Sequence, residues 1–113
     1  MRLRTIIVIL VFIISFSAVA IAVQNEGEKD IKLDGGTRGI IDFPHHQHQN
    51  VLIDCNICHD VFPKTAESIK DLKMQGKLEK KQVMDKTCLE CHKKMQKAGE
   101  KTGPTRCSAC HTK

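Results

Sequence analysis

The sequence predicts a small α+β domain that is mostly irregular, with an N-terminal two-stranded β-hairpin followed by short helices. Three observations support this fold class. Two short apolar runs, residues 31–33 and 40–43, flank the turn signal "DGGTRG". Apolar side chains are otherwise thinly spread among lysines. All six cysteines and six histidines lie between residues 45 and 111.

The first 22 residues have the order of an export signal. Arg2 and Arg4 precede an apolar run that ends in Ala20-Ile21-Ala22, which predicts cleavage after Ala22. A retained anchor is the alternative, since residues 5–23 are almost long enough to span a bilayer. In both cases the remaining domain, residues 23–113, is expected to work outside the cytoplasm.

The 91 residues that remain after cleavage hold few large apolar side chains. They contain no Trp or Tyr, and their only phenylalanines are Phe43 and Phe62. A side-chain core this small cannot offset the conformational entropy of the chain, so a second source of stability is needed. The polar segment 23–30 is expected to fray.

The cysteines form three copies of one motif, CNICH, CLECH and CSACH. The copies comprise Cys55, Cys58 and His59; Cys88, Cys91 and His92; and Cys107, Cys110 and His111. Cys-x-x-Cys-His is the attachment signature of c-type haem. Its two thiols add to the two vinyl groups of one haem, and the imidazole that follows binds the iron as proximal ligand.

Cys-x-x-Cys pairs also occur in zinc sites, in disulfide frameworks and in thioredoxin-like redox pairs. None of these requires a histidine after every second cysteine, and histidine is only 6 of 113 residues. We therefore expect three covalently bound haems c. They supply the apolar interior that the side chains lack, and the chain without haem is expected to be largely disordered.

Three histidines remain for the second axial positions of three irons. They are His45, His46 and His48, in the stretch "FPHHQHQN". His45 and His48 are three residues apart and share one face of a helical turn, which Pro44 is suited to begin. His46 points about 100° away from His45 on the helical period.

The order of these features resembles the triheme class III c-type cytochromes of the cytochrome c7 type, which are related to tetraheme cytochrome c3. The resemblance covers residues 31–113 and is carried by "IKLDGGTRGIIDF", by F-x-H-x-x-H at residues 43–48, by the three motifs and by "GPTRCSACHTK". It implies a haem-cored fold. It also implies that His45 binds the first haem opposite His59, and that His48 binds the middle haem opposite His92.

The resemblance further implies a histidine four residues before the middle motif, as distal ligand of the third haem opposite His111. Position 84 is a methionine instead. A thioether is an established haem ligand that raises the reduction potential relative to two histidines. Met84 is therefore the expected distal ligand. His46 is the alternative if Met84 only packs on a haem face, and Met74 and Met95 are weaker candidates.

Two helices are expected after the first motif. One runs through "TAESIKDLKMQG", with Thr65 as its cap and Gly76 as its stop. The other spans residues 77–99, carries the middle motif and ends near Gly99. The stretch between the first two motifs is longer than the resemblance leads one to expect.

Loss of Arg2 and Arg4 leaves a polypeptide charge of +3, which six haem propionates shift toward neutral or negative values. Lysines nevertheless crowd the middle and last motifs, at Lys77, Lys80, Lys81, Lys86, Lys93, Lys94, Lys97 and Lys101. Such a rim around a haem edge steers acidic redox partners, although it also simply solubilises a small protein. Nucleic-acid binding is not expected, because no aromatic residues are interleaved with the basic ones.

Together, the motifs and the resemblance predict a monomeric periplasmic electron carrier from a bacterium of the Gram-negative type. The resemblance implies a role in anaerobic respiration, between inner-membrane donors and terminal or outer-membrane acceptors. The alternative is a reductase that acts directly on metal ions or another acceptor, at a haem with an open sixth position. Membrane contact is expected only if the leader is retained.

Overall fold

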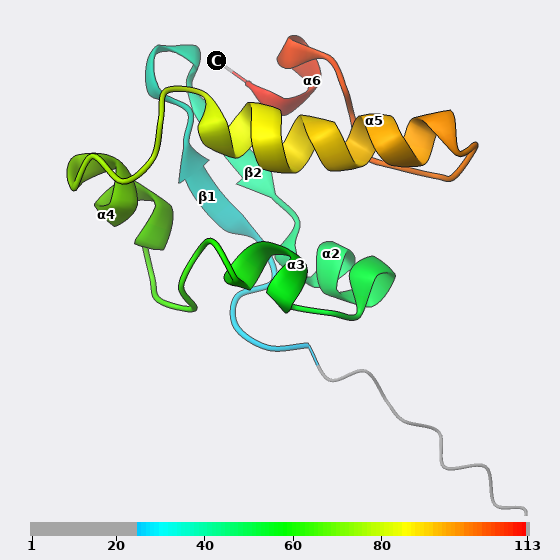
Figure 1. Cartoon of the computed structure of the whole chain (residues 1–113), viewed down its shortest axis with the longest axis horizontal. Helices are drawn as coiled ribbons and strands as arrows, with labels where there is room; N and C mark the ends of the chain where they lie inside the picture. Colours follow the sequence, from blue (N-terminus) through cyan, green and yellow to red (C-terminus); the bar gives the residue numbers. More distant parts are fainter. Residues whose placement is uncertain (1–24, 113) are drawn as a thin grey trace, which may run out of the picture.

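The computed structural model describes residues 25–112 (Figure 1), so the predicted export signal lies outside the described residues. Strands β1 (Ile31–Asp34) and β2 (Ile40–Phe43) come first, and five short helices follow: α2 (His45–Leu52), α3 (Asn56–His59), α4 (Ser68–Met74), α5 (Glu90–Lys97) and α6 (Cys107–Cys110). The predicted α+β class is confirmed. Within residues 25–112, no helix is both long and apolar enough to cross a membrane.

The two strands form an antiparallel hairpin with alternating faces. Its register pairs Ile31 with Phe43 and Leu33 with Ile41, and these four side chains form the half-buried face. The opposite face is exposed and carries the Lys32–Asp42 ion pair. The period of two in the sequence therefore places the apolar side chains toward the helices.

Both helices after the first motif start later than expected. Helix α4 begins at Ser68 rather than after Thr65, because Glu67 lies in the left-handed region with φ 58°. The second helix begins as a π-helical segment, η2 (Val83–Leu89), and continues as α5. Residues 77–81 are not helical, and Lys81 has φ 66°. The predicted C-terminal stops hold, since both helices end before a glycine at positive φ, Gly76 and Gly99.

Side chains bury very little surface in this fold. Among the described residues, Phe62 is the only buried apolar side chain, at 7% exposure, and no polar side chain is buried. Large apolar side chains such as Ile53 and Met74 are 72% and 71% exposed. The helices and the hairpin lie around the centre of the molecule (Figure 1), and the described side chains form almost no buried core there. A non-protein core is therefore required.

We expect the polypeptide without its haems to lack a cooperative fold, because almost no apolar surface is buried between its side chains. Replacing all six cysteines by alanine removes the attachment points. Far-ultraviolet circular dichroism and amide hydrogen exchange should then show little helix and little protection. A sharp thermal unfolding transition of this variant would contradict the expectation.

Candidate haem sites

Helix α2 presents two imidazoles whose Nδ1 atoms are held by backbone carbonyls. The Nδ1–H of His45 donates to the carbonyl oxygen of Glu28 at 3.0 Å, and that of His48 donates to Pro44 at 2.9 Å. Phe43 packs against His48, with ring centroids 4.4 Å apart. A hydrogen bond at Nδ1 fixes the ring tautomer and leaves Nε2 free to bind a metal.

The proximal imidazoles of the first and middle motifs are held in the same way. His59, the last residue of α3, donates from Nδ1 to the carbonyl of Phe62 at 2.8 Å. His92 on α5 donates to Pro104, also at 2.8 Å. Their Nε2 atoms are therefore free as well.

These four rings form two pairs. The ring centroids of His45 and His59 are 6.1 Å apart, with ring planes at 82°, and those of His48 and His92 are 6.1 Å apart at 28°. A metal–nitrogen bond is about 2.0 Å and an imidazole centroid lies about 1.1 Å from its nitrogen, so two imidazoles that bind one metal from opposite sides are about 6 Å apart. The spacing of both pairs therefore fits two axial ligands of one iron. Because the neighbouring rings of His45 and His46 are also 6.1 Å apart, it is the place of His59 and His92 in the haem-attachment motifs that distinguishes these two pairs.

His111, the proximal histidine of the last motif, has a different environment. It packs against the hairpin turn, where a Cβ on Gly35 would lie 2.8 Å from its Nδ1 and 2.2 Å from the Gly39 carbonyl. The next residue, Thr112, forms a β-bridge with Ile40. Among the described residues, the Nδ1 of His111 is the one buried side-chain polar atom without a hydrogen-bond partner, and no imidazole faces this ring as in the other two pairs.

The two candidates for its distal partner are in different places. Met84 is half-buried on η2, in the helix that leads to the middle motif. His46 lies beside His45, with ring centroids 6.1 Å apart, and its Nε2 is hydrogen-bonded to the Gly27 carbonyl at 2.9 Å. His46 thus uses the Nε2 nitrogen that His48, His59 and His92 leave without a hydrogen bond, whereas Nε2 of His45 lies 3.4 Å from Gln49 Nε2.

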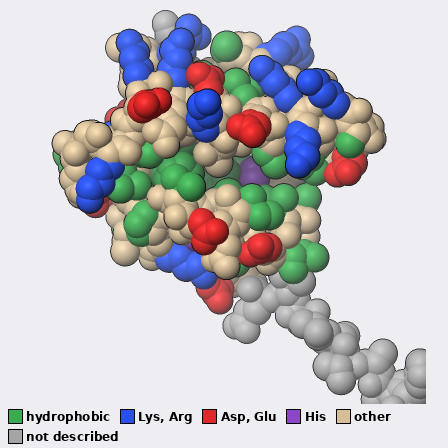
Figure 2. Space-filling model, viewed as in Figure 1, with side chains coloured by type: hydrophobic (Ala, Val, Ile, Leu, Met, Phe, Trp, Pro, Cys, Tyr) green, Lys and Arg blue, Asp and Glu red, His purple; other side chains and the backbone are tan. Residues whose placement is uncertain are grey.

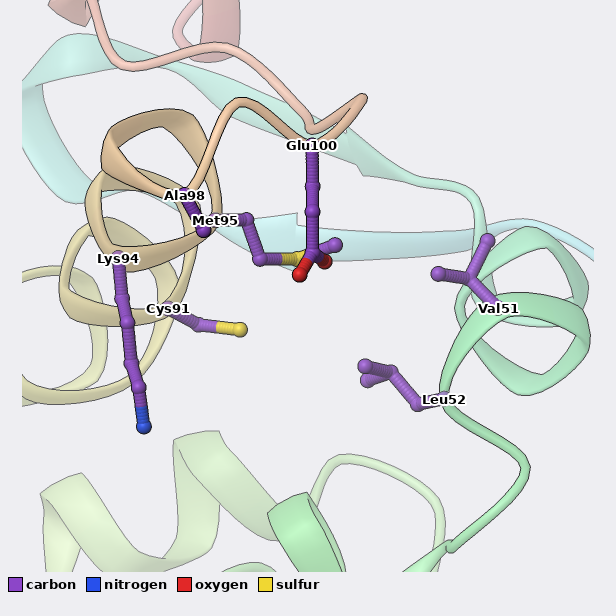
Figure 3. Close-up of a pocket in the computed structure, with 7 residues that line it drawn as sticks. All are labelled: Val51, Leu52, Cys91, Lys94, Met95, Ala98 and Glu100. Atoms are coloured by element: carbon purple, nitrogen blue, oxygen red, sulfur yellow. The ribbon is translucent and has the colours of Figure 1, made fainter.

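A cavity of about 370 Å³ lies beside the middle motif, between α2 and α5 (Figure 3). The side chains of Leu52 and Cys91 point toward each other across it. Its lining residues are Val51, Leu52, Cys91, Lys94, Met95, Ala98 and Glu100. Because Val51 and Leu52 follow His48 by three and four residues, they share its face of the helix. The lining is mostly apolar and contains a motif cysteine, as a covalent haem site requires.

The six thiols are free, and burial makes three of them less acidic. All six cysteines are unpaired. Burial raises the pKa of the Cys58 and Cys88 thiols, and the nearby thiols of Cys91 and Cys110 respectively raise it further. Burial also raises the pKa of Cys110. Reactive thioredoxin-like pairs have a lowered thiol pKa, so this environment does not suit them. Sulfurs from different motifs influence one another, which shows that the three motifs converge.

Sequence reasoning did not identify the backbone groups that hold the proximal rings. Gly103 and Pro104 precede the last motif, yet they contact the proximal histidine of the middle one. A Cβ on Gly103 would lie 2.5 Å from Cε1 and 2.7 Å from Nε2 of His92, and Pro104 accepts its Nδ1–H. The dipeptide Gly103-Pro104 is the sequence signal that could have indicated this contact, since Gly-Pro is typical of a turn whose backbone comes close to a neighbouring group.

Three haem-attachment motifs, paired imidazoles and an interior not filled by side chains define a multihaem c-type cytochrome. Comparison with known proteins identifies the family of cytochromes to which the chain belongs. The Class III cytochrome C family model matches residues 19–111, and the chain belongs to this family. It binds three covalent haems c and is an electron-transfer protein.

Individual relatives agree with this assignment. A curated cytochrome c7 from Geobacter metallireducens is 38% identical over 75 residues, which cover 66% of this chain and 67% of the relative. Cytochrome c3 of Maridesulfovibrio salexigens is 33% identical over 93 residues, covering 68% and 82%. The solution structure of triheme cytochrome PpcA from Geobacter sulfurreducens has a TM-score of 0.54 and 32% identity, covering 76% of this chain and all of that one.

We expect Gly103→Ala to disturb the middle site selectively. The added methyl group meets the His92 ring, so the ring or the loop must move, at a cost of about 1–3 kcal/mol in the free energy of unfolding. Haem-resolved NMR should show altered signals for the middle haem. The control is Gly76→Ala, where the methyl group meets nothing within 4 Å and only the positive φ of 67° is strained. Equal changes at the middle haem in both variants would contradict the prediction.

Proposed function

We propose that this protein is a periplasmic carrier in anaerobic respiration, moving electrons between inner-membrane donors and terminal or outer-membrane acceptors. The facing of His45 with His59 and of His48 with His92, at 6.1 Å in both pairs, carries the proposal. Two strong axial ligands close both faces of an iron, which favours outer-sphere electron transfer over binding of a substrate.

The chain's residues have distinct roles in this proposal. The six motif cysteines hold the haems covalently, and His59, His92 and His111 are the proximal ligands. His45 and His48 are the distal ligands of the first and middle haems. Bound haem iron accepts and releases one electron at a time. The carbonyls that hold the imidazole Nδ1 atoms fix ring orientation, so little has to rearrange when the charge at the site changes.

Met84 is proposed as the distal ligand of the third haem. The hydrogen bond from His46 to Gly27 favours Met84 over His46, because it uses the Nε2 that would have to bind iron. Met95 is less suitable, since its sulfur accepts a hydrogen bond from Thr102, and Met74 is largely exposed. His111 also lacks the Nδ1 acceptor that makes an imidazole a stronger donor. Both ligands thus favour a high reduction potential at the third haem.

Exposed lysines are the proposed docking surface for acidic redox partners. All eight lysines of the middle and last motifs are exposed, and basic side chains gather over the half of the molecule that contains α5 (Figure 2). The ion pairs found among the described residues involve three other lysines, Lys32, Lys64 and Lys70. The eight lysines are therefore available to attract an acidic partner and orient it.

The class of function is tested by haem content and ligation. A pyridine haemochrome assay should give three haems c per chain, and the ferrous protein should bind no carbon monoxide at neutral pH. The alternative function, direct reduction of metal ions or another acceptor, is favoured by the absence of an imidazole facing His111 within residues 25–112. It requires an open sixth position, so one carbon monoxide per chain and a high-spin ferric signal would support it.

We expect Met84→His to lower the reduction potential of the third haem alone. Replacing a thioether by an imidazole should shift it by on the order of 0.1 V, within the range of about 0.8 V that axial ligands span. Haem-resolved NMR redox titration measures the shift, and the upfield methionine methyl signal of the reduced protein should disappear. Met74→His is the matched control, since that side chain is 71% exposed on α4. An unchanged third potential would refute ligation by Met84.

A further inference from the structure

The segment just before β1 lies against helix α2 instead of fraying. We call residues 26–29 the N-terminal strap. Its four consecutive carbonyls all accept hydrogen bonds from the helix. Gln49 Nε2 donates to Glu26 at 2.8 Å, and His46 Nε2 donates to Gly27 at 2.9 Å. His45 Nδ1 donates to Glu28 at 3.0 Å, and the backbone N–H of His46 donates to Lys29 at 3.1 Å.

Two further contacts hold the start of the strap. The backbone N–H of Glu26 donates to Gln49 Oε1 at 3.2 Å, so the Gln49 amide pairs with both backbone groups of that residue. The Glu26 carboxylate lies 3.5 Å from Lys64 Nζ. Gly27 has φ 71°, a conformation that glycine adopts without strain. The strap is thus fastened by Gln49 and Lys64, neither of which is a proposed haem ligand. Gln49 Nε2 also lies 3.4 Å from Nε2 of His45, a contact that iron bound at that nitrogen would replace.

We propose that His46 and Gln49 are positioning residues for the distal ligand of the first haem, acting through the strap. The carbonyl that holds His45 belongs to Glu28. Of the carbonyls on either side of it, that of Gly27 accepts from the His46 side chain and that of Lys29 accepts from the backbone N–H of residue 46, so only the first contact depends on the imidazole. This inference rests on the proposed ligation of the first iron by His45. It gives the third imidazole of "FPHHQHQN" a function other than metal binding.

The effect should be confined to the first haem. The other distal imidazole, His48, donates its Nδ1–H to Pro44, four residues earlier in its own helical turn, and does not contact the strap through it. His59 is held by Phe62, directly after its own motif. Among the four paired imidazoles, His45 alone depends on the strap for the hydrogen bond that fixes its tautomer and ring orientation. Loss of such outer-shell partners typically weakens metal binding about 10–100-fold.

The test measures how easily an external ligand displaces His45. In the haem-loaded double variant His46→Ala/Gln49→Ala, we expect the ferrous first haem to bind carbon monoxide under conditions in which the same haem of the parent protein binds none, because the distal imidazole is held less firmly. Ferric electron paramagnetic resonance should show a change in the first haem's signal, because the angle of 82° between its two ring planes sets that signal. The single variant His46→Gln, in which Gln49 is intact, keeps an N–H donor at position 46. Its first haem should therefore behave mostly like that of the parent protein, both in carbon monoxide binding and in its ferric signal.

Gln47→Ala is the matched control. Gln47 is exposed on the same helix and makes none of the side-chain hydrogen bonds found among the described residues, so its variant should behave like the parent. Amide exchange of Glu26 provides a readout independent of haem, since this N–H loses its acceptor in Gln49→Ala. Faster exchange with unchanged carbon monoxide binding would overturn the positioning role while showing that the strap had been released.

A third variant separates this inference from the proposed function. His45→Ala removes the proposed ligand itself and should open one carbon monoxide site per chain. If it opens none, His45 is not a ligand and the pairing proposed above fails, together with the inference. If His45→Ala opens the site while the His46 and Gln49 variants leave the first haem unchanged, the pairing stands and the strap inference is wrong.

Discussion

The fold depends on one helix that holds distal imidazoles for two different motifs. Helix α2 faces α3 through His45 and His59, and it faces α5 through His48 and His92. The partner residues are 14 and 44 positions away in the chain. Because the described side chains bury almost nothing between them, these pairs, if bridged by haem iron as proposed, would stabilise the fold as a hydrophobic core does elsewhere. The short helices need little stability of their own.

Backbone carbonyls fix the orientation of the paired imidazoles. Each paired imidazole donates from Nδ1 to a carbonyl, and the four acceptors come from four different places: the strap, the start of α2, the turn after α3 and the loop before α6. Irregular segments are thereby tied to the metal sites. This explains why a chain with so little regular structure still has a defined shape.

The sequence was sufficient for the features that have a local signal. The hairpin follows from its alternation and turn, and the three motifs from their spacing. The starts of α4 and η2 were predicted too early. Glu67 and Lys81 adopt left-handed backbone conformations, which are uncommon for these residue types and therefore cannot be predicted from their preferences. The expected fraying of residues 23–30 was wrong for the strap. Its order comes from hydrogen bonds to Gln49 and His46, about twenty residues further along the chain, and composition does not reveal such contacts.

The turn of the hairpin has a consequence for how this sequence can vary. A side chain at Gly35 would collide with the backbone carbonyl of Gly39 and with the ring of His111 at once. The first tight turn and the last haem motif, at opposite ends of the domain's sequence, therefore constrain each other's shape. Substitution of Gly35 should therefore be selected against as strictly as changes in the motif itself, although Gly35 is not part of a haem-attachment motif. A search for distant relatives could use this turn as a second marker.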